Sequence, residues 1–146
     1  HITRATELGL TIDDVISLAS LIEKEAKTDD FKRVSAVFHN RLKQNEPLGS
    51  DAPLQYIYKT NSLLFTPEQL NDPSLYNTRI HKGLPLGPIA NPGRTAIEAV
   101  LYPDEEFIEA NYMYFCLKDI DTGELVYAKT LEEHNKNVEL YRSNWR

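Results

Sequence analysis

Two glutamates near the end of a predicted helix are the residues best suited to acid–base chemistry. Apolar residues recur at spacings of three and four through residues 11–27, which predicts a helix with one buried face. Glu23 and Glu25 lie on opposite margins of that face, roughly 160° apart around the helix axis, so their carboxyls cannot share one site. A carboxyl held partly out of water has a raised pKa and becomes a usable general acid near neutral pH. The spacing leaves both residues open as the acid, and it also leaves open an ordinary boundary role in which their carboxyls reach water.

Polar and aromatic residues in the turn-rich part of the chain are suited to binding sugars. Tyrosine combines an apolar ring face, which matches a pyranose ring, with a polar tip. Side-chain amides and an aspartate match hydroxyl and N-acetyl groups. Ordinary glycoside hydrolysis uses two carboxyls that face each other across the bond, and Asp51 is the only obvious second carboxyl. The sugar-binding side chains expected from these segments are Asp51, Gln55, Tyr56, Tyr76, Asn77 and Asn91.

The composition excludes several classes of function. The chain has a net charge of −6 and no cluster of Lys and Arg, which argues against nucleic acid or an anionic membrane surface as a partner. Its four histidines are scattered and it has one cysteine, Cys116, so we expect no metal site. It has no P-loop, dinucleotide or G-x-S-x-G motif, and we expect no cofactor. No apolar run approaches the length of a transmembrane helix.

The pattern of elements predicts one domain, residues 1–146, of the α+β class, because helical segments come first and a strand hairpin follows. The first two helices should pack as a hairpin, with Asn40 on the polar face of the second. A loop as long as residues 71–93 is uncommon unless it has a function such as lining a cleft, and residues 104–106 are expected to form a solvated turn. The expected helices cover residues 11–27, 31–44, 51–58, a short segment from 66, 92–101 and 130–141, and the expected strands cover 112–117 and 125–128.

Six short motifs, which occur in a fixed order, carry a family resemblance. They are LASLIEKEA at 18–26, VFHNRL at 37–42, LGSD at 48–51, YNT at 76–78, GLPLGPIANPG at 83–93 and HN at 134–135. Together they extend over residues 11–138 and resemble the YceG-like family of endolytic murein transglycosylases (MltG). The chain departs from the family pattern at Gly49, at Ala52-Pro53 and at Leu86.

The resemblance implies a reaction and a set of site residues. It assigns the catalytic role to the first glutamate of the E-K-E segment, Glu23. The family cleaves the β-1,4 bond between N-acetylmuramic acid and N-acetylglucosamine and leaves a 1,6-anhydromuramoyl end. Glu23 would protonate the leaving oxygen and then accept the proton of the substrate's own C6 hydroxyl, so that one carboxyl is sufficient. The residues expected to contact the glycan are Ser50, Asp51, Tyr76, Asn77, Thr78 and Asn91.

The resemblance also implies a cellular setting. Family members carry a membrane anchor and a LysM-like module before the catalytic domain, so this chain is expected to be the catalytic part of a longer protein on the outer side of the cell membrane. The membrane would be reached only through a segment outside this sequence. Peptidoglycan glycan strands are the expected substrate, and cell-wall synthesis proteins are candidate partners. Three other hypotheses remain open: a peptidoglycan-binding module without activity, a structural partner of cell-wall synthesis proteins with the loop 71–93 as its interface, and a hydrolase that uses Glu23 and Asp51.

Overall fold

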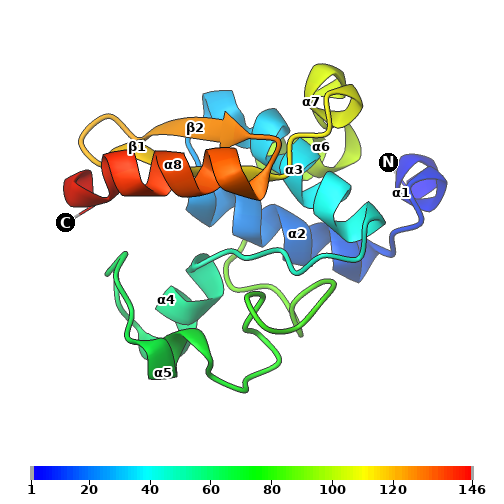
Figure 1. The fold of residues 1–146 in the computed structure, drawn as a ribbon. Coiled ribbons are helices and arrows are strands. Elements are labelled where there is room, and N and C mark those ends of the chain that lie inside the picture. The colour runs from blue at the N-terminus through cyan, green and yellow to red at the C-terminus, as the bar shows by residue number, and fades with distance from the viewer. Residues whose placement is uncertain (1, 146) are drawn as a thin grey trace.

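The computed structural model describes residues 2–145, which are arranged around the central helix α2 (Ile12–Glu25). Figure 1 shows a β-hairpin and the C-terminal helix α8 (Leu131–Tyr141) on one side of α2. The short helices α4 (Ala52–Tyr58) and α5 (Pro67–Leu70), with long loops, lie on the other side. This combination of helices and an antiparallel hairpin confirms the predicted α+β class.

Helix α2 begins where the sequence predicts. The amide of Asp14 donates to Thr11 Oγ1 (3.1 Å) and the amide of Thr11 donates to Asp14 Oδ2 (2.9 Å), which satisfies two N–H groups at the start of the helix. Its apolar face is buried from Val15 to Ile22, apart from the half-buried Ile16, whereas Ile12 at the start of the helix is 50% exposed. The helix ends at Glu25, because Ala26 has an extended backbone. The side chain of Glu25 therefore projects from the last turn of α2, where the backbone changes from helical to extended.

The core is formed by three helices. A single turn, η1 (Thr28–Asp30), connects α2 to α3 (Phe31–Lys43), and these two helices form the predicted hairpin. Helix α6 (Arg94–Leu101) packs against both. The predicted start of α6 at residue 92 is wrong, since Gly93 is its N-cap. The fully buried large side chains of this core include Leu18, Leu21, Ile22, Val34, Phe38, Val100 and Leu101.

Two further helices were not expected from the sequence. Helix α1 (Ile2–Glu7) is fastened to the core by Arg4, whose Nε donates to the carbonyl of Leu101 at 2.7 Å. Residues 104–106 do not form the expected turn, because Asp104 Oδ1 accepts a hydrogen bond from the amide of Phe107 (3.0 Å) and starts helix α7 (Glu105–Glu109).

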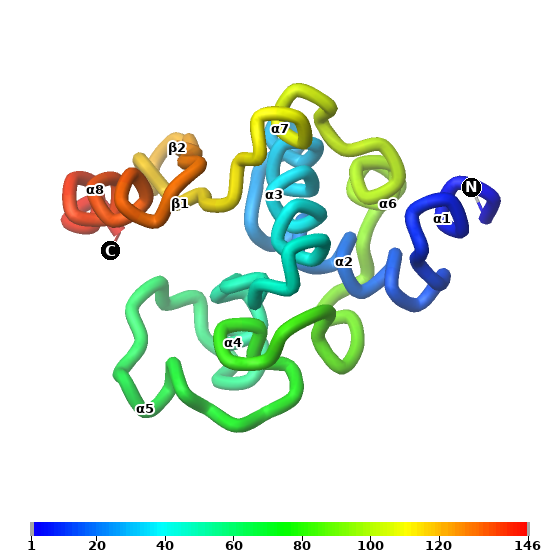
Figure 2. Tube along the Cα trace, turned by 45° about the vertical axis from the view of Figure 1, so that its right-hand side comes forward, coloured from blue at the N-terminus to red at the C-terminus, as the bar shows by residue number. Residues whose placement is uncertain are grey.

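The hairpin consists of β1 (Tyr114–Asp119) and β2 (Glu124–Ala128), which pair antiparallel with Tyr114 opposite Ala128. Helix α8 packs along this hairpin, and Figure 2 shows the two as a layer beside α3. Within residues 2–145 the sheet has two strands, and no helix of this part is both long and apolar enough to cross a membrane. The predicted strand and helix order of the C-terminal part is confirmed.

Candidate active site

The carboxyl of Glu25 is held by the loop that precedes α4. Ser50 Oγ donates a hydrogen bond to Glu25 Oε1 at 2.7 Å, and the amide of Ala52 donates to the same oxygen at 3.1 Å. Ser50 is buried, and Ala52 is the first residue of α4. The last residue of one helix thus caps the first turn of another, which fixes the position of the carboxyl from both sides.

The surroundings of Glu25 favour its protonated form. Its pKa is raised from 4.5 to about 7 as the net result of four effects: burial is the largest, and the hydrogen bond from Ser50 opposes it. The nearby charge of Asp51 raises the pKa further, whereas the amide of Ala52 lowers it. At neutral pH the group is therefore present in both its acid and its base form, which suits a residue that must first donate a proton and then accept one.

Asp51 is the neighbouring carboxyl and has a different environment. Its pKa is raised overall by burial, and the charge and hydrogen bond of Arg79 limit this rise. Arg79 Nη1 lies 2.9 Å from Asp51 Oδ1, in an ion pair whose side chains are 39% and 35% exposed. Because Arg79 neutralises it, Asp51 is better suited than Glu25 to remain a carboxylate.

Both carboxyls line a groove of about 690 Å³ that we call the large groove. Its lining residues come from the hairpin and α8 on one side and from α4 with its following loop on the other, and Figure 1 shows these elements on opposite sides of α2. Its apolar lining includes Leu63, Leu64 and Phe65 from that loop. Its charged and amide side chains are Lys24, Glu25, Arg41, Glu46, Asp51, Gln55, Arg79, His134, Asn135 and Arg142.

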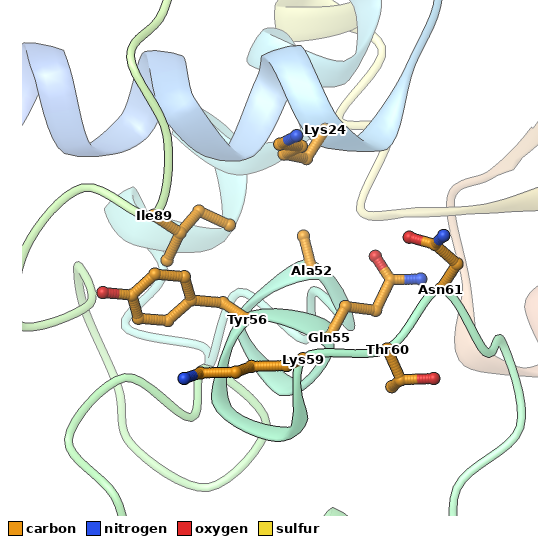
Figure 3. A pocket seen from close by; sticks show the side chains of 8 residues that line it. All are labelled: Lys24, Ala52, Gln55, Tyr56, Lys59, Thr60, Asn61 and Ile89. Carbon is orange, nitrogen blue, oxygen red and sulfur yellow. The ribbon is translucent and has the colours of Figure 1, made fainter.

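A smaller pocket of about 340 Å³ adjoins the large groove, since Lys24 and Gln55 line both. Figure 3 shows Lys24 extending from α2 toward α4, with the amides of Gln55 and Asn61 on the opposite wall. Tyr56 forms one side of this pocket, and in Figure 3 Ile89 lies above the ring of Tyr56. The two hollows therefore lie next to each other, and both are lined by apolar and hydrogen-bonding groups.

Glu23, the residue assigned by the family resemblance, lies elsewhere. Its Oε1 accepts a hydrogen bond from the amide of Gly93 at 2.8 Å, so its carboxyl caps helix α6. A Cβ added at Gly93 would lie 3.4 Å from the same oxygen, so glycine permits the close approach. Among the described residues, Glu23 is not one of those that line the large groove or the smaller pocket.

Three of the residues expected to bind substrate are buried and hold loops together. Asn77 Nδ2 donates to the carbonyls of Leu70 (3.1 Å) and Asp72 (2.8 Å). Thr78 Oγ1 accepts from the amide of Ser50 (3.1 Å) and donates to its carbonyl (3.0 Å). Thr78 therefore positions Ser50 beside Glu25, and the side chain of Asn77 holds its own loop.

The other residues expected at the site are more accessible. The ring of Tyr76 contacts that of Tyr56, with centroids 5.3 Å apart, so these two tyrosines form one aromatic surface next to the smaller pocket. Asn91 is exposed in the loop before α6. The long segment 71–93 contributes Arg79 to the large groove and Ile89 to the smaller pocket, which is the cleft-lining role expected of it.

Sequence reasoning did not identify Arg41 and Arg79, two of the three arginines that line the large groove. Arg41 bridges distant loops, because its Nε donates to the carbonyl of Pro47 (2.6 Å) and its Nη1 to that of Met113 (2.7 Å). Arg79 pairs with Asp51, which is 28 residues away in the sequence, and no local pattern predicts a contact over that separation. The only signal for either was that Arg41 lies within the VFHNRL motif.

Known proteins are similar in sequence to most of this chain. An endolytic murein transglycosylase of Bacillus subtilis (strain 168) is 39% identical over 136 residues, which cover 92% of this chain and 36% of that protein. One of Streptococcus pneumoniae serotype 2 is 34% identical over 136 residues, covering 89% of this chain and 24% of that protein. The chain thus spans a minor part of the length of each.

The fold has a solved counterpart. The crystal structure of a yceG-like protein from Listeria monocytogenes superposes with a TM-score of 0.77 and 35% identity, over 92% of this chain and 42% of that one. The YceG-like family matches residues 1–140. The family match, the similar sequences and the similar fold agree, so the chain belongs to the YceG-like family.

Proposed function

We propose that this chain is the catalytic domain of an enzyme that cuts the glycan strands of peptidoglycan. The names of its relatives support murein as the substrate class. The observation that carries the proposal is the carboxyl of Glu25, which lies in the large groove with its pKa raised to about 7. In the full-length protein this domain would act on the outer side of the cell membrane.

The bond cleaved would be the β-1,4 bond between N-acetylmuramic acid and N-acetylglucosamine. Protonated Glu25 donates its proton to the bridging oxygen as the bond from that oxygen to C1 breaks. The resulting carboxylate accepts the proton of the muramoyl C6 hydroxyl, whose oxygen bonds to C1 and closes a 1,6-anhydro ring. The nucleophile belongs to the substrate, so attack is intramolecular, and Glu25 ends the cycle protonated.

The sequence-based prediction of Glu23 as the acid is the competing assignment. The helix-capping hydrogen bond of Glu23 and its position away from the large groove favour Glu25 for this role. The resemblance assigns the role to the first glutamate of the E-K-E segment, whereas the groove and the hydrogen bonds favour the second glutamate of the same segment. Single replacement of each by glutamine distinguishes them.

Hydrolysis is a second candidate activity, because Asp51 lines the same groove and its charge acts on Glu25. Two carboxyls are the usual equipment of a glycoside hydrolase. Mass spectrometry of the products decides: a transglycosylase gives anhydro ends, and a hydrolase gives reducing ends that contain oxygen from labelled water. Binding of glycan strands with no new ends would instead indicate a peptidoglycan-binding module without activity.

A further inference from the structure

The charge of the large groove differs from that of the whole chain. The chain has 22 acidic residues against 16 Lys and Arg. The groove is lined by four Lys or Arg side chains and three carboxyls, and one of those carboxyls, Glu25, is only partly ionised at neutral pH. An acidic protein therefore presents a locally basic surface next to the candidate acid, which favours a negatively charged group there.

Arg41 is held rigidly in this wall. Its hydrogen bonds to Pro47 and Met113 fix the guanidinium, and its central carbon lies 5.0 Å from the centroid of the Tyr114 ring. Immobilising an arginine in the free protein lowers the entropy lost when a ligand binds to it. The planar guanidinium also matches the two oxygens of a carboxylate.

His134 lies on the same tyrosine. Its ring stacks on Tyr114 with centroids 5.0 Å apart and planes inclined by 20°. Within the described part of the chain, His134 Nδ1 is buried and has no hydrogen-bond partner. A buried polar atom without a partner is costly, and a ligand group in the groove would supply what it lacks.

Arg79 completes the set from the opposite wall. It pairs with Asp51 through Nη1, and it remains 39% exposed. Burial lowers the pKa of His134, and the charges of Arg41 and Arg79 lower it further, which is consistent with the three groups being close together. Two permanent cations and a neutral imidazole thus face one region of the groove.

We propose that Arg41, Arg79 and His134 form a subsite that binds a carboxylate of the glycan's lactyl or peptide branch. This inference rests on the proposed function, because it is the glycan substrate that brings such carboxylates to the groove. Occupation of the subsite fixes the register of the strand relative to Glu25 and selects strands by the charge of their branches. It also explains how a chain with a net charge of −6 attracts an acidic polymer.

The test compares three glycan substrates: strands with stem peptides, strands stripped by an amidase so that lactyl carboxylates are free, and stripped strands whose carboxylates are converted to neutral methyl amides. The readout is the ratio of kcat/KM for a charged strand to that for the neutral strand, which cancels any general loss of activity. The wild-type ratio should be about ten, equivalent to about 1.4 kcal/mol. A high ratio for stripped strands identifies the lactyl carboxylate as the group bound. A ratio that is high only for peptide-bearing strands identifies a carboxylate of the stem peptide.

The variants are Arg79→Gln, which removes one cation, and His134→Phe, which keeps a ring on Tyr114 and removes the nitrogen. Each should lower the ratio several-fold, mainly through KM. Arg79→Lys should preserve more of it. Arg41 is left intact because it also joins Pro47 to Met113. The matched control is Lys136→Gln, on the same helix as His134 but with a side chain 75% exposed, and its ratio should equal that of the wild type.

A wild-type ratio near one, or a ratio that neither variant changes, overturns the subsite. If the wild type cuts none of the strands, the proposed function fails, and the subsite is then judged by calorimetric titration of the same strands. Tighter binding of charged than of neutral strands supports it in that case, and equal affinity contradicts it.

Discussion

The hydroxyl of Ser50 donates a hydrogen bond to the carboxyl of Glu25 at 2.7 Å. Glu25 is the last residue of α2, and Ser50, 25 residues later, lies in the loop before α4, which is itself held by Thr78. This contact makes the pKa of Glu25 lower than burial alone would set it. The serine therefore adjusts the acid strength of the group on which the proposed chemistry depends.

Replacement Ser50→Ala should move the pH profile of glycan cleavage to higher pH. The hydrogen bond stabilises the carboxylate, so its loss raises the pKa of Glu25 and keeps the acid form present to higher pH. The alkaline limb of kcat against pH should shift upward. The control is Ser35→Ala, since Ser35 is also buried but its Oγ has no partner in the described residues. An unchanged alkaline limb in Ser50→Ala would contradict this role for the serine.

Glu25 should make the stability of the folded protein depend on pH. Its pKa is 4.5 when unfolded and about 7 when folded, so the folded state binds more protons between these values. Stability therefore falls as pH rises from 4.5 to 7, by up to about 3 kcal/mol. Below 4.5 both states are protonated and the effect disappears.

Glutamine at position 25 removes this dependence while preserving shape. Urea unfolding should show Glu25→Gln to be more stable than the wild type at pH 8, and close to it at pH 4. The difference in free energy of unfolding between the two proteins, measured at both pH values, gives the contribution of Glu25 separately from that of the other titrating groups. Equal differences at the two pH values would mean that the carboxyl is not shielded from water.

Replacement Glu23→Ala should lower stability without abolishing cleavage. The change removes the acceptor for the Gly93 amide at the start of α6, and loss of a helix cap costs about 1 kcal/mol. Thermal unfolding of Glu23→Ala and Glu23→Gln should differ, because glutamine retains an acceptor oxygen. If both variants were as stable as the wild type, the capping role of Glu23 would be wrong.

Local patterns predicted most of the fold because they act over a few residues. The apolar faces of the first two helices follow from spacings of three and four residues, and the capping boxes at Thr11 and Thr66 join residues only three apart. Asn40 was expected on a polar face and is instead buried, because its amide donates to the carbonyls of Phe107 (3.1 Å) and Tyr112 (2.9 Å). These partners belong to a distant segment, which no helical pattern reveals.

The site was less predictable for the same reason. The helical wheel separates Glu23 from Glu25 but cannot say which of them faces a groove, since the loop at Ser50 and the loop at Gly93 cover their carboxyls. Residue type identified Asn77 as a sugar ligand, whereas its hydrogen bonds are used within the fold. The residues that surround a carboxyl decide its chemistry, and they come from elsewhere in the chain.

Glycan cleavage by a matched pair of variants tests the central claim most directly. Purified glycan strands are incubated with wild-type, Glu25→Gln and Glu23→Gln protein, and the released ends are identified by mass spectrometry. Loss of general acid–base catalysis should slow Glu25→Gln by about 10²–10⁴-fold, while Glu23→Gln continues to release anhydro-ended fragments. Undiminished release by Glu25→Gln, together with an inactive but folded Glu23→Gln, would contradict the account and return the catalytic role to Glu23.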